Sequence, residues 1–170
     1  MKVFLLDADV IIWCAENNKL DALFKNKRIH IPQIIYEQVI HYTIPTTGQK
    51  KTILFDKFIH DGYLTIIDNP VTEEIIKIKD TYKQCPQLAE IHDGESECIA
   101  TLLKDKECKF CTGDVDAMKV IGFWGLLEQA VSLEELVGRI KNLRPNFTKD
   151  CMESHLKQGA ILRVQYSNWD

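Results

Sequence analysis

Short apolar runs alternate with longer amphipathic stretches along most of the chain. The short runs are rich in aliphatic, aromatic and β-branched side chains, which favours strands, while the longer stretches repeat apolar residues at helical spacing. We expect strands at Lys2–Leu6, Arg28–Ile31, Tyr63–Ile67 and Lys109–Thr112, with a very short fifth strand at Ala130-Val131. We expect helical stretches at Asp9–Phe24, Pro32–Tyr42, Lys51–His60, Glu73–Gln84, Asp93–Leu103 and Thr148–Lys157, and a helical region at Val115–Gln129 that is broken around Gly122 and Gly125.

Strands that alternate with helices predict an α/β fold in which a parallel sheet is covered on both faces. We therefore expect a three-layer α/β/α sandwich with a parallel sheet of four or five strands. The 170 residues fit a single domain, residues 1–170, with a C-terminal helical extension from about residue 137. A capping box of Ser132 and Glu135 starts the helix before that extension. In sheets of this kind, ligands bind at the carboxyl ends of the strands.

Composition and charge narrow the class of protein. Hydrophobic residues make up 45% and charged residues 27%, which excludes a mainly disordered or collagen-like chain. The net charge of −4 excludes a generally basic nucleic-acid coat, so binding to nucleic acid would need local positive patches or metal ions. No apolar run approaches the roughly 20 residues that span a bilayer, and the N-terminus lacks a signal-peptide pattern. We expect a cytoplasmic protein without membrane association, its six cysteines reduced.

Aspartates follow two of the expected strands. Asp7 ends the first strand, and Asp114 follows the fourth, with Asp116 two residues later. Because the carboxyl ends of parallel strands share one edge of the sheet, these acids are expected close together, where like charges raise one another's pKa. A divalent cation relieves that repulsion, and hard oxygen ligands select Mg²⁺ or Mn²⁺. The alternative is that each aspartate, Asp9 included, only caps a helix N-terminus.

Glu95 is expected to point towards the core. It lies three and four residues before Cys98 and Ile99, so it shares their apolar helix face, whereas Glu97 points to the opposite side. Its place in the first helical turn suits an acid, because the helix dipole favours negative charge there. A carboxylate on the core side of a helix needs a partner. That partner is either a metal ion or, in the alternative interpretation, only the backbone amides of the helix start.

Glu37 is a weaker candidate. It shares the polar stripe of its expected helix with Gln33 and His41, while the other sides carry apolar residues. A polar stripe of this kind is usually a solvated face. Periodicity alone therefore gives Glu37 no functional role.

Four segments together resemble the PIN-domain family of metal-dependent ribonucleases. Leu5–Ile12 (LLDADVII) is similar to the opening strand of the family, and Ile31–Val39 (IPQIIYEQV) to the segment that carries its second acid. Asp93–Ala100 (DGESECIA) resembles its third motif, and Cys111–Asp116 (CTGDVD) resembles its fourth, a Thr-x-Asp at a strand end. The four motifs follow one another in family order over most of the chain.

The resemblance implies a parallel five-stranded α/β/α sandwich and hydrolysis of RNA phosphodiester bonds with Mg²⁺ or Mn²⁺ as cofactor. The implied site residues are the catalytic acids Asp7, Glu37, Glu95 and Asp114, the metal ligands Asp7, Glu95, Asp114 and Asp116, and the accessory residues Asp9 and Thr112. Many family members are toxins neutralised by a small protein, so an antitoxin is an implied partner besides the RNA substrate. The chain departs from the family in three ways: its fifth strand is hard to find in the sequence, its C-terminal segment is longer, and its third acid is a glutamate.

Two other functions compete with this interpretation. The segment Asp7–Asp9 is also similar to the opening of haloacid-dehalogenase-type phosphatases, in which the first aspartate is a nucleophile. Position 11 carries Ile where that pattern has Thr or Val, and the two glutamates have no role in that scheme. The other alternative is a non-catalytic binding or scaffold module. In that case the apolar stretch Ile121–Leu127 would serve a partner or a homodimer contact rather than the core.

Cys108 and Cys111 form a Cys-x-x-Cys pair. A zinc site usually needs a second pair or histidines at matching spacing, which this sequence does not show. Because the pair falls in or next to an expected strand, we expect both side chains to pack in the core.

Overall fold

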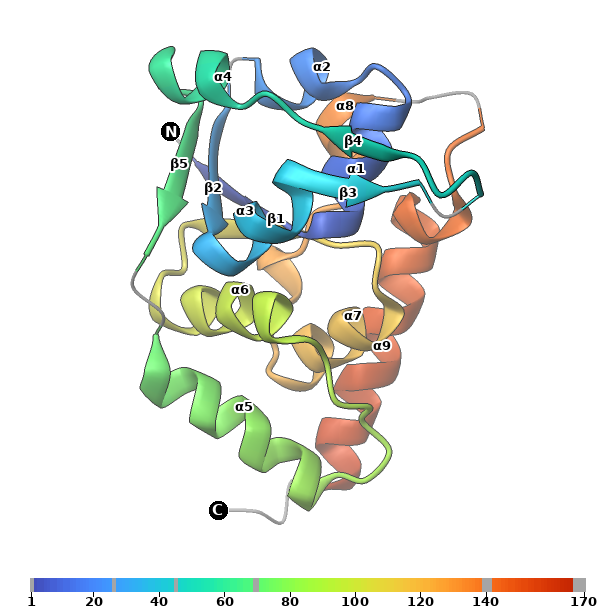
Figure 1. Ribbon diagram of the computed structural model, residues 1–170. Coiled ribbons are helices and arrows are strands. Elements are labelled where there is room, and N and C mark those ends of the chain that lie inside the picture. Colours follow the sequence, from blue (N-terminus) through green and yellow to red (C-terminus); the bar gives the residue numbers. More distant parts are fainter. Residues whose placement is uncertain (1, 26, 45, 69–70, 139–141, 167–170) are drawn as a thin grey trace.

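Four strands form a parallel sheet in a computed structural model that describes residues 2–25, 27–44, 46–68, 71–138 and 142–166. In sheet order the strands are β5 (Leu64–Ile67), β2 (Arg28–Pro32), β1 (Val3–Leu6) and β6 (Cys108–Cys111) (Figure 1). Beyond β6, Ala130 forms one parallel bridge with Phe110, and the Val131 N–H donates to the Phe110 carbonyl at 3.0 Å. The fifth strand expected at this point is therefore a single bridge.

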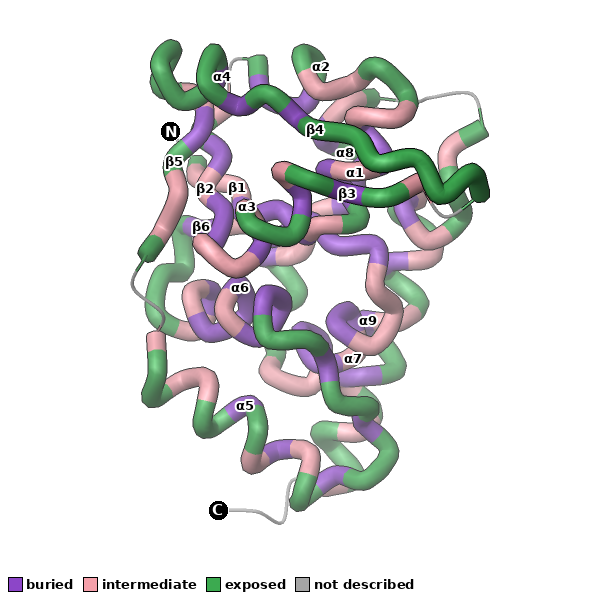
Figure 2. The backbone as a smooth tube through the Cα atoms, viewed as in Figure 1, coloured by how far each residue is buried: buried purple, intermediate pink, exposed green. Residues whose placement is uncertain are grey.

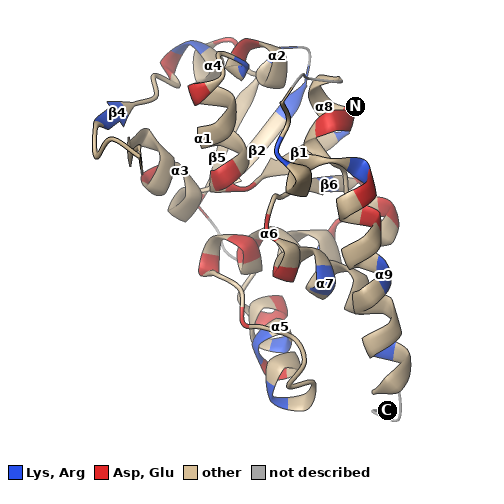
Figure 3. Cartoon of the chain, turned by 90° about the vertical axis from the view of Figure 1, so that its right-hand side faces the viewer, with Lys and Arg blue, Asp and Glu red and all other residues tan. Residues whose placement is uncertain are grey.

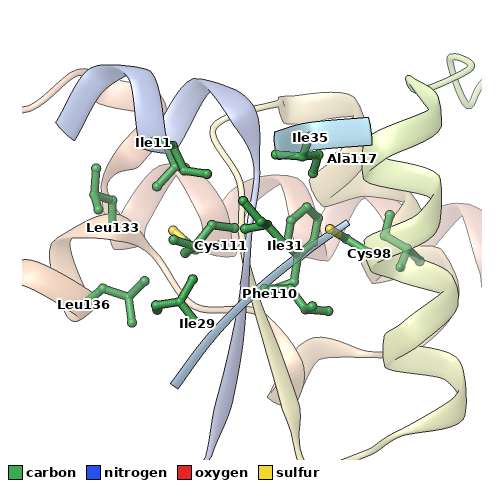
Figure 4. Close-up of a cluster of buried hydrophobic side chains, with 14 of the residues drawn as sticks. Ile11, Ile29, Ile31, Ile35, Cys98, Phe110, Cys111, Ala117, Leu133 and Leu136 are labelled. Atoms are coloured by element: carbon green, nitrogen blue, oxygen red, sulfur yellow. The ribbon is translucent and has the colours of Figure 1, made fainter. Parts of the chain in front are cut away.

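Helices cover both faces of this sheet. α1 (Ala8–Glu16), α2 (Leu20–Phe24) and α8 (Leu133–Val137) lie on one face, and α6 (Asp93–Lys104) and α7 (Val115–Phe123) lie on the other (Figure 1). In Figure 4, Ile29 and Cys111 point towards Ile11 and Leu133, whereas Phe110 points to the opposite side, where Cys98 lies. The fold is thus the expected three-layer α/β/α sandwich.

The core lies between these layers. Burial is nearly continuous along the central strands and on the helix faces turned towards them, while the outer helix faces are exposed (Figure 2). α5 (Thr72–Gln84) packs against α6 from outside, and α3 (Gln33–Ile40) follows β2 directly. The central strands carry hydrophobic runs because a parallel sheet is buried on both faces.

The C-terminal segment packs closely on the rest of the fold. α9 (Lys149–Gln165) runs along α7, and each helix contributes a glycine to the contact. A Cβ atom on Gly122 would overlap the Leu156 carbonyl, and one on Gly159 would overlap the Lys119 carbonyl. The two backbones approach this closely only because neither position carries a side chain.

Two of the expected helices have different limits in the structure. The expected helix at Lys51–His60 begins as β4 (Lys50–Thr52), and only α4 (Asp56–His60) is helical. The helix expected to reach Tyr42 ends at Ile40 and continues as β3 (His41–Thr43), which pairs with β4 in an antiparallel ribbon outside the main sheet. Gly48, with φ of +67°, lies in the connection and supplies the left-handed conformation that a hairpin turn requires.

A third departure divides the helical stretch expected at Asp9–Phe24. The structure separates it into α1 and α2 around Asn18, whose φ of 54° interrupts a helix.

Within the described residues, no helix is both long and apolar enough to cross a lipid bilayer.

Candidate functional site

Asp7 lies at the junction of β1 and α1. Its backbone N–H donates to the Cys111 carbonyl at 3.1 Å, which continues the ladder between β1 and β6 by one residue. Its side chain caps α1, with Oδ1 accepting the Ala8 N–H at 2.6 Å. Asp7 as a whole residue is 7% exposed, so the carboxyl edge of the sheet holds a nearly buried acid.

A threonine links this acid to the next one. The Thr112 hydroxyl donates to Asp7 Oδ2 at 2.9 Å and accepts the Asp114 N–H at 3.0 Å. Asp114 then caps α7, with Oδ1 accepting the N–H groups of Asp116 and Ala117 at 2.6 and 2.9 Å. The parallel register of β1 and β6 brings the two strand ends level, so one hydroxyl reaches both segments.

Glu95 comes from the start of α6. Its Oε2 accepts the backbone N–H of His92 at 3.0 Å, as in a capping box, and the side chain is buried at 4% exposure. The preceding residue, Gly94, permits a close approach of α3, because a Cβ atom there would lie 2.7 Å from Ile35 Cγ1. Glu95 therefore caps the helix, as in the second interpretation, and lines a cavity with the other acids, while a metal ion as its partner stays a prediction.

These acids line one cavity of about 300 Å³. Its walls consist of Asp7, Ala8, Asp9, Gln38, His92, Gly94, Glu95 and Asp114. Acidic residues gather where α1, α6 and α7 begin (Figure 3). The lining contains four carboxylates and no lysine or arginine.

Crowding and burial change the pKa of two of these acids. Burial raises the pKa of Glu95 to about 8, and the charges of Asp7 and Asp114 add to this effect. Burial likewise raises the pKa of Asp7 to about 6, with Asp9 and Asp114 contributing, although the Thr112 hydroxyl and the Ala8 N–H oppose the rise. The cavity therefore disfavours its own full ionisation and favours a cation.

The donor atoms fit Mg²⁺ or Mn²⁺, which bind carboxylate oxygens in preference to softer ligands. One oxygen of Glu95 and one of Asp114 accept no hydrogen bond from the residues that the structure describes, so both can ligate. As they stand, no three acidic, histidine or cysteine side chains in the described part of the chain form a group that could hold one ion. Shared ligation by the three acids requires side-chain rotation towards a common centre.

Three of the residues implied by the family resemblance lie outside this cavity lining, namely Thr112, which bonds to Asp7 and Asp114, and the acids Glu37 and Asp116. Glu37 is exposed on α3, where Oε1 accepts a hydrogen bond from Gln33 Nε2 at 2.8 Å. Asp116 forms an ion pair with Lys119 at 2.8 Å. The structure thus brings Asp7, Asp9, Thr112, Glu95 and Asp114 together and places these two acids beside them.

Sequence reasoning missed Gln38 and His92, which both line the cavity. Gln38 follows Glu37 directly and both are exposed, so helix phase decides which of the two borders the cavity. His92 is the N-cap residue of α6, a position at which Ser, Thr, Asp or Asn would have been a recognisable signal.

The Cys-x-x-Cys pair is buried in β6, as expected for core packing. Residues three apart in a strand point to opposite faces, so Cys108 and Cys111 cannot ligate one metal ion together. The Cys108 thiol donates instead to Asp105 Oδ2 at 3.3 Å. The apolar segment Ile121–Leu127 is divided, with Ile121 fully buried and Leu127 at 43% exposure.

The chain matches no protein-family model and no curated protein.

Proposed function

We propose that this protein is a Mg²⁺- or Mn²⁺-dependent ribonuclease of the PIN type, which hydrolyses phosphodiester bonds in RNA. The observation that carries the proposal is a cavity at the carboxyl edge of the sheet that is lined by Asp7, Glu95 and Asp114 from three separate elements. Their mutual repulsion gives the cavity affinity for a divalent cation. The order of the four sequence motifs and the parallel α/β/α architecture support the same assignment.

In this proposal Asp7, Glu95 and Asp114 would ligate the cation, and the neighbouring residues keep these acids in place. When bound, Mg²⁺ or Mn²⁺ would lower the pKa of a water molecule and place positive charge next to the phosphodiester. The Thr112 hydroxyl fixes the rotamer of Asp7 and the backbone before Asp114. Asp9, exposed at the rim, adds negative charge to the cavity.

The test is cleavage of an end-labelled mixed RNA by the purified protein with Mn²⁺ or Mg²⁺. We expect cutting that EDTA abolishes and that Asp114→Asn lowers by about 10³-fold, the order of loss seen when transition-state charge stabilisation is removed. Asparagine is as good an N-cap as aspartate, so this variant should keep α7 and the fold. Asp105→Asn is the matched control, because Asp105 precedes β6 at the opposite edge of the sheet, and its cleavage rate should stay within twofold of wild type.

Three outcomes would contradict the proposal. Cleavage by Asp114→Asn at the wild-type rate would exclude Asp114 from the site. Turnover of a small phosphomonoester without RNA cleavage would indicate a phosphatase that uses Asp7 as nucleophile. Absence of any turnover in a folded protein that binds the metal would indicate a binding or scaffold module.

A further inference from the structure

The C-terminal segment returns to the candidate site through two residues of a 3₁₀ turn (Pro145–Phe147). The Asn146 side-chain amide, Nδ2, donates to the Gly113 carbonyl at 2.7 Å. Gly113 is the middle residue of the β6–α7 turn, which we define as Thr112–Asp114. This contact therefore reaches the backbone between the hydroxyl that binds Asp7 and the carboxylate of Asp114.

Phe147 contacts the same turn and also reaches α1. Its ring lies so close to Gly113 that a Cβ atom on Gly113 would overlap the ring edge. The ring also packs edge-on against Trp13 of α1, with centroids 5.7 Å apart and planes at 68°. Phe147 is 1% exposed and Trp13 is 4% exposed, so the contact is closed to water. One side chain is thus held between α1, which begins next to Asp7, and the turn that ends in Asp114.

We propose that Asn146 and Phe147 are positioning residues that hold the β6–α7 turn against α1 and so set the separation of the Asp7 and Asp114 carboxylates. The proposal rests on the proposed function, because this separation matters for joint ligation of a cation. Two like charges repel each other, and the only residue between Thr112 and Asp114 is a glycine, which has no side chain to anchor it. The amide of Asn146 and the ring of Phe147 supply that anchorage from a segment 33 and 34 residues further along the chain.

A general contribution to stability has to be separated from positioning. Ser132 serves this purpose, because it lies outside both the 3₁₀ turn of Asn146 and Phe147 and the β6–α7 turn. Its hydroxyl caps α8 by accepting the Glu135 N–H at 3.2 Å. Ser132→Ala should lower the melting temperature by a few degrees through loss of that cap, without touching the β6–α7 turn.

The experiment compares Asn146→Leu with Ser132→Ala in the full-length chain. Leucine branches at Cγ as asparagine does but has no amide donor. The first measurement is hydrogen exchange of the Asp116 and Ala117 amides in metal-free protein, since both amides bind Asp114 Oδ1. The second is Mn²⁺ affinity, followed by the electron paramagnetic resonance of free Mn²⁺. For Asn146→Leu we expect about tenfold faster exchange and about tenfold weaker Mn²⁺ binding, typical of an outer-shell substitution at a metal site.

Ser132→Ala should change neither quantity by more than twofold. Unchanged exchange in Asn146→Leu, or equal effects in the two variants, would overturn the proposal and leave the C-terminal segment a purely stabilising role. Faster exchange with unchanged Mn²⁺ affinity would also overturn it, because the contact would then not position the acids. If wild-type protein neither binds Mn²⁺ nor cuts RNA, the proposed function fails, and the exchange comparison alone decides whether Asn146 holds the turn.

Discussion

Two helices of this protein begin with the same local motif and place it in opposite electrostatic surroundings. Glu95 in α6 and Glu135 in α8 are both third residues of capping boxes, and each accepts the backbone N–H of its N-cap residue at 3.0 Å. Around Glu135 the neighbouring charge is opposite, since Lys149 Nζ lies 3.6 Å from its Oε1. Around Glu95 the neighbouring charges are those of Asp7 and Asp114.

The pKa values of the two glutamates diverge accordingly. Burial acts to raise the pKa of Glu135, but the hydrogen bonds from Ser132 and the charge of Lys149 outweigh it, and the pKa is lowered. Burial and two like charges raise the pKa of Glu95 to about 8. A capping acid and a candidate ligand acid therefore look the same in the local sequence. The distinction between them lies in the charge that tertiary structure brings to each.

The cavities beside the two glutamates repeat this contrast. The cavity beside Glu135 is the larger, at about 570 Å³, but its lining mixes lysines with glutamates. There Lys149 also lies 3.8 Å from Glu153, and Lys109 Nζ donates to the Glu128 carbonyl. The smaller cavity beside Glu95 has four carboxylates and neither lysine nor arginine in its lining. Uncompensated charge of one sign, rather than volume, identifies the candidate site.

The rate of RNA cleavage should show the largest difference between substitutions of Glu95 and of Glu135. Glu95→Gln removes one negative ligand while its amide oxygen can still accept the His92 N–H, so the rate of RNA cleavage should fall by about 10³-fold. Glu135→Gln makes the same chemical change at the other capping box and should leave the rate within twofold of wild type. Initial rates at saturating Mn²⁺ measure both. Equal losses in the two variants would mean that Glu95 acts only through the fold.

The pH dependence of protein stability should give the second-largest difference between Glu95 and Glu135. The folded-state pKa of Glu95, about 8, exceeds its unfolded value of 4.5, so the folded protein binds this proton more tightly between those limits. The stability of the metal-free protein must then fall as pH rises through that window and level off above pH 8. From pH 6 to pH 9 we expect the melting temperature to drop by about 5 °C more in wild type than in Glu95→Gln.

Asp7 adds a similar decline in stability at lower pH, which ends near its folded-state pKa of about 6. Glu135→Gln should retain the decline above pH 6, because its pKa is lowered and the stability it provides is lost only in acid. Melting curves of chelator-treated protein, followed by circular dichroism, measure all three proteins. A wild-type curve that is flat or rising between pH 6 and pH 9 would show that Glu95 is ionised without a cation.

Features encoded by nearby residues were predictable from the sequence. The apolar runs gave the four strands, and their alternation with helices gave the parallel sheet and the three-layer sandwich. The rule that ligands bind at carboxyl strand ends directed attention to Asp7 and Asp114, and helix phase directed it to Glu95. The structure brings these three acids to one cavity.

Features that depend on distant contacts were not predictable in this way. The ribbon of β3 and β4 replaces expected helix, because pairing between Tyr42 and Lys51 across a turn outweighs local helical spacing. The contact of Asn146 with Gly113 joins residues 33 positions apart and has no local signal. The choice of Gln38 over Glu37 as a cavity residue depends on how α3 packs against Gly94.

Substitution of a third glutamate, Glu37, should have the smallest effect on RNA cleavage, and it tests whether Glu37 or Gln38 faces the cavity. The family resemblance implies a catalytic role for Glu37, whereas the structure leaves it exposed, with Gln33 as its hydrogen-bond partner. Exposed charges are screened by water and salt, so Glu37→Gln should lower RNA cleavage by no more than about threefold. Gln38→Leu, which changes the neighbouring cavity residue, should have the larger effect on KM. A loss approaching that of Glu95→Gln would show that α3 turns Glu37 into the cavity when the cation and RNA bind.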